Sequence, residues 1–340
     1  MVIEETTRIL SDLIAFPSIS ADSNLEMIDY LANRLDDCGA AVDIFRDESG
    51  QKANLFATLG PQCDGGIVLS GHSDVVPVTD QDWTSDPFEM VERDGLLFGR
   101  GTCDMKGFIA AALAMAPVYA KSVRERPIHF AFTYDEETGC IGAGHLAKAL
   151  SNYPFKPSLA IIGEPTEMRI IAGHKGCFEY STRFQGLEGH GSAPDLGVKA
   201  VEYAVRYVSR LLELREELKS KAPKNSRFDP PWTTMNIGGL HGGSVHNVIA
   251  PKAQVDWEMR PVQNSDADFI KTRMGEHIDH DLLPAMRAVH PDADIVTHTI
   301  GEIMGLEAMP DSEAVKLVCE LVGGLGIFLL GMKNMSEGIL

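Results

Sequence analysis

Apolar residues recur at two different spacings along the first half of the chain. Residues 3–15 and 24–38 place them at helical intervals, and residues 106–120 form an alanine-rich apolar stretch that predicts a buried helix. Shorter apolar runs predict strands at residues 41–45, 53–59, 67–71, 128–134 and 159–163. Because helices separate several of these strands, the pattern predicts an α/β fold whose mixed, mostly parallel sheet is flanked by helices.

The alternation of helices and buried strands changes near residue 176. Strands are predicted at residues 178–185, 233–239 and 252–260, and helices at residues 197–221 and 266–288. The third of these strands alternates polar residues with four apolar ones, Ala253, Val255, Trp257 and Met259. This alternation is typical of a sheet with one exposed face. The second half therefore predicts a smaller α+β domain inserted into the first.

The length of 340 residues favours two domains over one compact core. We expect a first domain at residues 1–177, an inserted domain at 178–290, an incomplete return to the first domain at 291–322, and an atypical apolar tail at 323–340. The tail is shorter than the roughly 20 apolar residues that span a bilayer. We therefore expect a foreign segment on a truncated domain and no membrane anchor.

Charge and cysteine usage narrow the class of protein. The 30 basic and 49 acidic residues give a net charge of -19, which argues against a nucleic-acid partner and against adhesion to anionic lipid. Six cysteines without a C-x-x-C pair indicate reduced thiols. The N-terminal segment lacks the basic start and apolar core of a signal peptide. A cytoplasmic protein is expected.

Histidine and acidic residues follow three of the predicted strands. His72 comes directly after the run at 67–71, Glu136 and Glu137 follow the run at 128–134, and Glu164 follows the run at 159–163. In open α/β sheets, ligands bind at the carboxyl ends of the strands. One histidine and several carboxylates at this edge predict a hydrolytic metal centre.

Two further carboxylates extend this set. Asp74 lies two residues after His72, so that on an extended segment both side chains face the same way and the carboxylate can orient the imidazole. Asp104 ends a glycine-rich turn ahead of the apolar stretch at 106–120.

Each residue also has a simpler interpretation. The pair His72 and Asp74 can be a hydrogen-bonded turn, and Glu136 with Glu137 a solvated acidic turn. Asp104 can be a helix N-cap, and Glu164 a loop carboxylate. Their joint occurrence favours a shared site. Competing chemistries lack their motifs, since the chain has no G-x-S-x-G elbow and no phosphate-binding G-x-x-x-x-G-K-[ST] loop.

Four motifs, GHSDVVP, GRGTCDMKG, TYDEETG and IIGEPT, occur in this order. In sequence and spacing they resemble the dinuclear zinc aminoacylase and carboxypeptidase family, over roughly residues 1–320. The resemblance implies two divalent metal ions, zinc or alternatively cobalt. The metal ligands that it implies are His72, Asp104, Glu137 and Glu164. Asp104 would bridge the two ions, Glu136 would be the general base, and Asp74 would orient His72.

The resemblance also assigns roles to the inserted domain, as a lid and dimer interface of a homodimer. His190, in GLEGH, matches a lid histidine that reaches the active site of a partner subunit and stabilises an oxyanion. Asn247 and Arg260 match positions that contact polar groups and the carboxylate of the substrate. From the residues alone, His190 can equally be a surface histidine in a glycine-rich loop.

The implied activity is hydrolysis of the amide of a small N-acyl amino acid, with N2-acetyl-L-ornithine expected as the substrate. The alternatives are succinyl-diaminopimelate or another acylated amino acid. The family supplies one more histidine ligand near its C-terminus, whereas no histidine here lies beyond His298. We therefore expect a weakened second metal site, and a non-catalytic remnant of the family stays an alternative.

Overall fold

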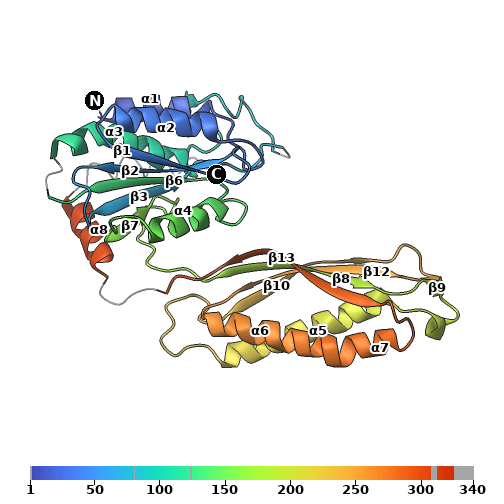
Figure 1. The fold of residues 1–340 in the computed structure, drawn as a ribbon. Coiled ribbons are helices and arrows are strands. Elements are labelled where there is room, and N and C mark those ends of the chain that lie inside the picture. Colours follow the sequence, from blue (N-terminus) through green and yellow to red (C-terminus); the bar gives the residue numbers. More distant parts are fainter. Residues whose placement is uncertain (1, 80, 123–124, 308–311, 325–340) are drawn as a thin grey trace. The chain divides into compact units, whose positions relative to one another are not determined.

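The computed structural model describes residues 2–79, 81–122, 125–307 and 312–324. These residues form two compact units, shown in Figure 1. The first unit comprises the described residues of Met1–Ile170 and Asp311–Leu340, and the second those of Ile171–Pro310. Residues 325–340, which include most of the predicted apolar tail, lie outside the described part of the chain.

The first unit is a five-stranded sheet flanked by helices (Figure 1). Its helices are α1 (Val2–Ile14), α2 (Leu25–Asp36), α3 (Lys106–Ser122), α4 (Ile141–Ser151) and α8 (Glu313–Gly324). The strands of its sheet are β1 (Ala41–Arg46), β2 (Ala53–Leu59), β3 (Ile67–His72), β6 (Ile128–Thr133) and β7 (Leu159–Ile162). A separate hairpin consists of β4 (Val91–Arg93) and β5 (Leu96–Phe98).

The order of the strands explains where side chains can meet. The order is β1-β2-β6-β3-β7, and β3 pairs in parallel with both β6 and β7. The carboxyl ends of these three strands therefore share one edge, with His72 opposite Thr133. The predicted mixed sheet is present, but β1, β2 and β6 pair antiparallel. The short connection between β1 and β2 permits only a hairpin.

Apolar side chains hold helices on both faces of this sheet. The faces of α1, α2 and α3 that bury Leu10, Leu31 and Ile109 pack in one core with Leu55 and Phe130 of the sheet. Helix α4 lies on the opposite face, where Leu146 joins a smaller core (Figure 1). Because both faces are covered, β2 is buried along its whole length.

The second unit has one four-stranded antiparallel sheet, in the order β10-β12-β8-β13, with helices on one face (Figure 1). Its strands are β8 (Cys177–Gln185), β10 (Thr234–Gly242), β12 (Lys252–Arg260) and β13 (Asp294–Ile303), and a small ribbon pairs β9 (Gly189–His190) with β11 (Val248–Ile249). Its helices are a short 3-10 turn (Pro194–Leu196), α5 (Ala200–Ser220), α6 (Asn264–His277), a π-helical turn (Ile278–Leu282) and α7 (Leu283–Arg287).

The predicted boundary at residues 290–291 is wrong. Strand β13, Asp294–Ile303, was expected to return to the first domain, but it pairs antiparallel with β8 along Cys177–Gln185. Ile295 lies opposite Phe184 and joins the core of the second unit. The return to the first unit comes later, in α8. No helix among the described residues has the length and apolar character needed to cross a bilayer.

A buried histidine beside the smaller core of the first unit makes stability depend on pH. His129 is fully buried, lies 3.0 Å from the hydroxyl of Thr58, and stacks between Phe56 and Phe155. Burial lowers the pKa of His129 below 6.5, although the Gly65 carbonyl opposes this shift. The unfolded chain thus binds the proton more readily, so this contribution to stability is complete above about pH 6.5 and is lost as the pH falls below it.

We therefore expect the melting temperature to fall between pH 7.5 and pH 5.5, and to fall less in His129→Gln, which cannot take up the proton. Thermal unfolding followed by circular dichroism at both pH values measures the difference. An equal fall in melting temperature between pH 7.5 and pH 5.5 for wild type and His129→Gln would contradict this role of His129.

Candidate metal centre

The imidazole of His72 ends strand β3 at the shared strand edge. Its side chain is only 1% exposed, and its Nε2 lies 2.9 Å from Asp104 Oδ1 and 4.0 Å from Glu164 Oε1. Asp104 comes from the turn before α3, and Glu164 follows β7. One donor atom from each of the three residues lies within 4.8 Å of the others. Residues far apart in the sequence therefore form one cluster whose donor atoms lie close enough to hold a metal ion.

The backbone fixes which nitrogen of His72 faces this cluster. The Nδ1–H donates to the backbone carbonyl of Asp74 at 2.9 Å, while the nearer carboxylate oxygen of Asp74 is 3.5 Å from Nδ1. Nε2 is thereby left as the donor atom toward a metal ion. Asp74 thus orients the ring through its carbonyl as well as its carboxylate.

The carboxylate of Asp74 binds the neighbouring turn. It accepts hydrogen bonds from the backbone N–H groups of Glu136 and Glu137, at 3.1 and 3.3 Å, and from the hydroxyl of Ser20 at 2.6 Å. Burial raises the pKa of Asp74, but hydrogen bonds with His72, Ser20 and Glu136 lower it below its ordinary value. Asp74 is therefore a buried anion that couples the end of β3 to the turn after β6.

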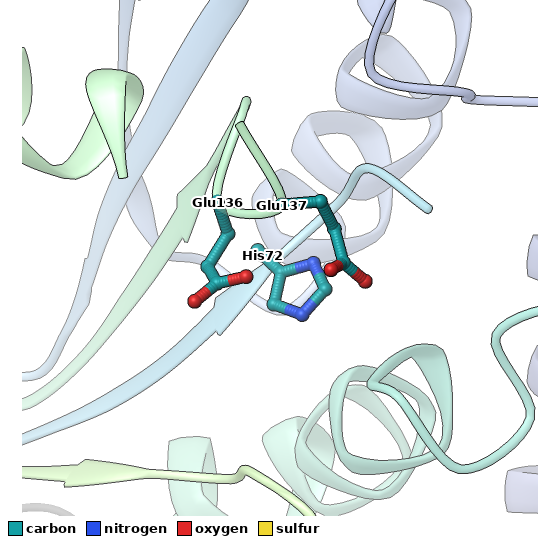
Figure 2. Close-up of side chains that lie close together, drawn as sticks. All are labelled: His72, Glu136 and Glu137. Carbon is teal, nitrogen blue, oxygen red and sulfur yellow. The ribbon is translucent and has the colours of Figure 1, made fainter. Parts of the chain in front are cut away.

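That turn carries the two adjacent glutamates. In Figure 2 Glu136 and Glu137 lie on either side of the His72 ring. One donor atom from each of these three residues lies within 4.8 Å of the others, which makes a second potential metal-binding group. Asp104, expected to bridge two ions, groups with His72 and Glu164 and not with this set. The thiol of Cys140 donates to Glu136 Oε1 at 3.6 Å.

Like charges crowd the cluster. Burial, reinforced by the charges of Asp104, Glu136 and Glu137, raises the pKa of Glu164 to about 7. Burial and the charge of Asp104 also raise the pKa of Glu137. Burial alone would lower the pKa of His72, but hydrogen bonds with Asp104 and Asp74 and the charge of Glu164 raise it to about 11. The site therefore favours an added positive charge.

This donor set fits a divalent ion such as zinc. Imidazole nitrogen and carboxylate oxygen are ligands that zinc accepts, and catalytic sites use three protein ligands with one open position. His72 is buried, whereas the side chains of Asp104 and Glu164 are 47% and 36% exposed. A substrate can thus reach the cluster from the side of these carboxylates.

A buried lysine beside the turn of Asp104 was not predicted as a functional residue from the sequence. Lys106, which is fully buried, donates from Nζ to the carbonyls of Leu13 and Phe16 and thereby ties the turn that carries Asp104 to the end of α1. Burial lowers the pKa of Lys106 to about 7, against the charge of Asp74. A lysine at the start of an otherwise apolar helix is the one sequence signal that could have indicated this role.

The other predicted functional residues lie in the second unit. His190 is exposed in β9, and the N–H of Gly191 donates to the carbonyl of Asn247 at 2.7 Å, so His190 and Asn247 belong to one small ribbon. Arg260 ends β12 and donates from Nε and Nη2 to Glu258 Oε2, at 2.9 and 2.7 Å. Arg260 therefore has a carboxylate partner of its own, and it lies at the end of β12 beside Phe178, away from the Gln185 end of β8 that leads to β9.

A further metal-type group occurs beside Arg260, from Cys177, Glu179 and Glu258. Burial raises the pKa of the Cys177 thiol despite the opposing charge of Arg260, so the sulfur stays protonated at neutral pH. The neighbouring guanidinium of Arg260 disfavours a cation at this group. We therefore place the metal chemistry at His72.

A cavity of about 390 Å³ also lies in the second unit, between α6 and β13, above an aromatic floor of Tyr180, Tyr207 and Trp257. The polar atoms of Tyr207 and Trp257 are already hydrogen-bonded to Thr182. None of the residues predicted to be catalytic lines this cavity.

Known proteins resemble this chain in sequence over most of its length. Residues 68–324 match the model of the peptidase family M20/M25/M40. Acetylornithine deacetylase of Klebsiella pneumoniae is 35% identical, and that of Proteus mirabilis 36%, in each case over 318 residues. These residues make up 92% of this chain and 80% of each relative.

Solved structures share the fold at lower identity. An M20 family metallo-carboxypeptidase from Sulfolobus solfataricus has a TM-score of 0.69 and 17% identity, covering 94% of this chain and 84% of that one. A tripeptidase from Staphylococcus aureus has a TM-score of 0.68 and 22% identity, covering 95% and 82%. A dinuclear metal-binding peptidase from Bacillus subtilis has a TM-score of 0.59 and 13% identity, covering 94% and 80%.

Proposed function

Since this chain belongs to the peptidase family M20/M25/M40, we propose that it is a metal-dependent amide hydrolase that removes the acetyl group from N2-acetyl-L-ornithine. The observation that carries the proposal is the cluster of His72, Asp104 and Glu164 with Glu136 beside it. The relatives that are 34% to 36% identical are named acetylornithine deacetylases, which supports the choice of substrate.

The residues of the chain divide the chemistry between them. His72, Asp104 and Glu164 would hold a divalent ion, which would supply a Lewis acid for the amide carbonyl and for water. Glu136 takes the proton from the attacking water and returns it to the leaving nitrogen. Asp74 holds the backbone of Glu136 in place through its hydrogen bond to the N–H. Glu137 would hold a second ion.

Residues of the second unit complete the proposal. The N–H of Ser192 donates to His190 Nδ1 at 3.2 Å, which puts the proton of the neutral ring on Nε2. An Nε2–H donor suits the expected role of His190, the stabilisation of a developing oxyanion in the active site of a partner subunit. Asn247 and Arg260 bind polar groups and the carboxylate of the substrate, where the fork of Arg260 suits both oxygens. When Arg260 binds the substrate carboxylate, it either releases Glu258 or keeps this ion pair alongside the new one.

The oligomeric state and the cellular location of the protein are also part of the proposal. We propose a homodimer through the second unit, because β13 stands at the end of the sheet order and an edge strand offers unpaired backbone groups to another chain. Light scattering measures the mass of the assembly, and a monomer at all concentrations would refute the dimer. All six cysteines are free thiols, which supports a cytoplasmic location.

Zinc binding tests the ligand assignment. His72 is common to the two groups of potential metal ligands among the described residues of the first unit, and its one available nitrogen serves a single ion. We therefore expect isothermal titration with zinc to show one tight site and one clearly weaker site. If the sites accept cobalt as well as zinc, titration with cobalt should also show one tight site and one weaker site. Two equally tight zinc sites would contradict the expectation of a weakened second site.

The substrate is tested by direct comparison. Zinc-loaded protein is assayed side by side with N2-acetyl-L-ornithine, N-succinyl-diaminopimelate and other N-acetyl amino acids. The proposal predicts the highest kcat/KM for acetylornithine. A clear preference for the succinyl compound would change the substrate assignment, and no metal-dependent hydrolysis of any amide would favour a non-catalytic member of the family.

A further inference from the structure

We propose that Lys52 is a positioning residue that holds the turn of Glu136 and Glu137 against Asp74. The inference rests on the proposed function, because it assigns those two glutamates to catalysis and metal binding. It concerns a residue outside the motifs at the metal centre, since Lys52 directly precedes strand β2 and is 83 positions distant in sequence from its acidic partner, Asp135.

The ammonium group of Lys52 bridges two segments. Its Nζ donates to both carboxylate oxygens of Asp135, at 2.6 and 2.7 Å, and to the backbone carbonyl of Ser20 at 2.5 Å. The side chains of Lys52 and Asp135 are only 17% and 12% exposed. The ammonium group of a largely buried ion pair that donates to two segments of the chain fixes the positions of those segments better than a solvent-exposed pair does.

Each of the two segments holds one side of the candidate site. Asp135 directly precedes Glu136, so the position of its carboxylate sets the start of the glutamate turn. Ser20 donates its hydroxyl to Asp74 Oδ2 at 2.6 Å, and Asp74 accepts the N–H groups of Glu136 and Glu137. Lys52 therefore joins the turn and its anchor in one closed chain of hydrogen bonds.

The backbone of the turn requires such support. Asp135 has a φ of 52°, in the left-handed region that residues other than glycine, aspartate included, adopt uncommonly. It is also buried, with 8% exposure. Without Lys52, a buried carboxylate would lose its cation, and an uncompensated buried charge is strongly unfavourable. The turn would then rearrange to expose Asp135 to water and would carry Glu136 with it.

Strand β2, which follows Lys52, is fixed independently of the Lys52 side chain. The N–H of Ala53 donates to Asn24 Oδ1, and Asn24 Nδ2 returns a bond to the carbonyl of Ala53. Asn54 bonds to the N–H of Tyr134 and to the carbonyl of Gly142. Removal of the ammonium group alone should thus disturb the glutamate turn while leaving β2 in place.

The decisive experiment compares wild type with Lys52→Met by hydrogen–deuterium exchange, zinc competition and steady-state kinetics. We expect faster exchange in peptides covering residues 134–140 and unchanged exchange in residues 106–122. We also expect a loss of about 10–100-fold in kcat or zinc affinity, the usual effect of removing a residue that orients metal ligands, with little change in KM. Lys52→Arg should recover much of the loss, because it restores a cation to Asp135.

Two further variants separate positioning from general stability. Lys156→Met removes a lysine of the same unit whose Nζ also binds backbone carbonyls, those of Leu150 and Ser151, and it should leave kcat unchanged. In an Asp135→Asn background, Lys52→Met should cost much less than in wild type, because the two residues act as one unit.

Unchanged exchange at residues 134–140, or a uniform increase across the whole first unit, would overturn the proposal. So would a kcat and zinc affinity equal to those of wild type. If wild type itself hydrolyses no amide, the proposed function fails, whereas exchange and zinc affinity still decide the role of Lys52.

Discussion

Replacing Glu136 with glutamine is expected to lower kcat by about 10²–10⁴-fold while zinc stays bound. The amide is close in shape to the carboxylate but cannot accept the proton of the attacking water. Glu136 lies beside His72, and its backbone N–H is held by Asp74, so the substitution should leave the turn in place. Acetate release from acetylornithine and zinc content are measured on the same sample.

The comparison with Glu137→Gln sharpens the result. Glu137 shares the turn but is assigned to metal binding, so its variant should lose zinc as well as activity. The assignment of Glu136 as the base would be refuted if wild type and Glu136→Gln released acetate at equal rates. It would also be refuted if Glu136→Gln lost its zinc, because the residue would then be a ligand.

Replacing His72 with asparagine is expected to abolish tight metal binding. His72 contributes to the two groups of potential metal ligands in the first unit, and its Nε2 faces Asp104 and Glu164. Losing a direct ligand should cost more than the roughly 10–100-fold in affinity that removal of an outer-shell partner costs. Because a bound ligand stabilises the native state, the rise in melting temperature that zinc produces in wild type should also disappear.

His298→Asn is the matched control, since His298 is an exposed histidine of β13 and belongs to neither group. Zinc should stabilise this variant as it does wild type. A His72→Asn protein that still bound zinc with wild-type affinity would show that the ion is held elsewhere.

The repeating patterns of the sequence predicted much of the fold. Amphipathic spacing and apolar runs located α1, α2, α3 and α5 and the strands of the first sheet, because these elements bury one face or all of their side chains. Strand β13 was missed, because most of its side chains are exposed and alternation is weak. Helix α4 was missed because two glycines interrupt its short apolar pattern.

The candidate site was predictable for a topological reason. Parallel strands place their carboxyl ends at one edge, so His72, Glu136 and Glu164 could be expected to meet before any contact was known. The family resemblance of the four motifs is confirmed. Lys52 and Ser20 could not be found in this way, because their contacts join segments 83 and 54 positions apart and leave no local signal.

Locating zinc in the loaded protein tests the central claim most directly. Anomalous diffraction at the zinc edge should place an ion within about 2.0–2.2 Å of His72 Nε2 and of carboxylate oxygens of Asp104 and Glu164. An ion bound at Cys177 and Glu258, or none within reach of His72, would contradict the account.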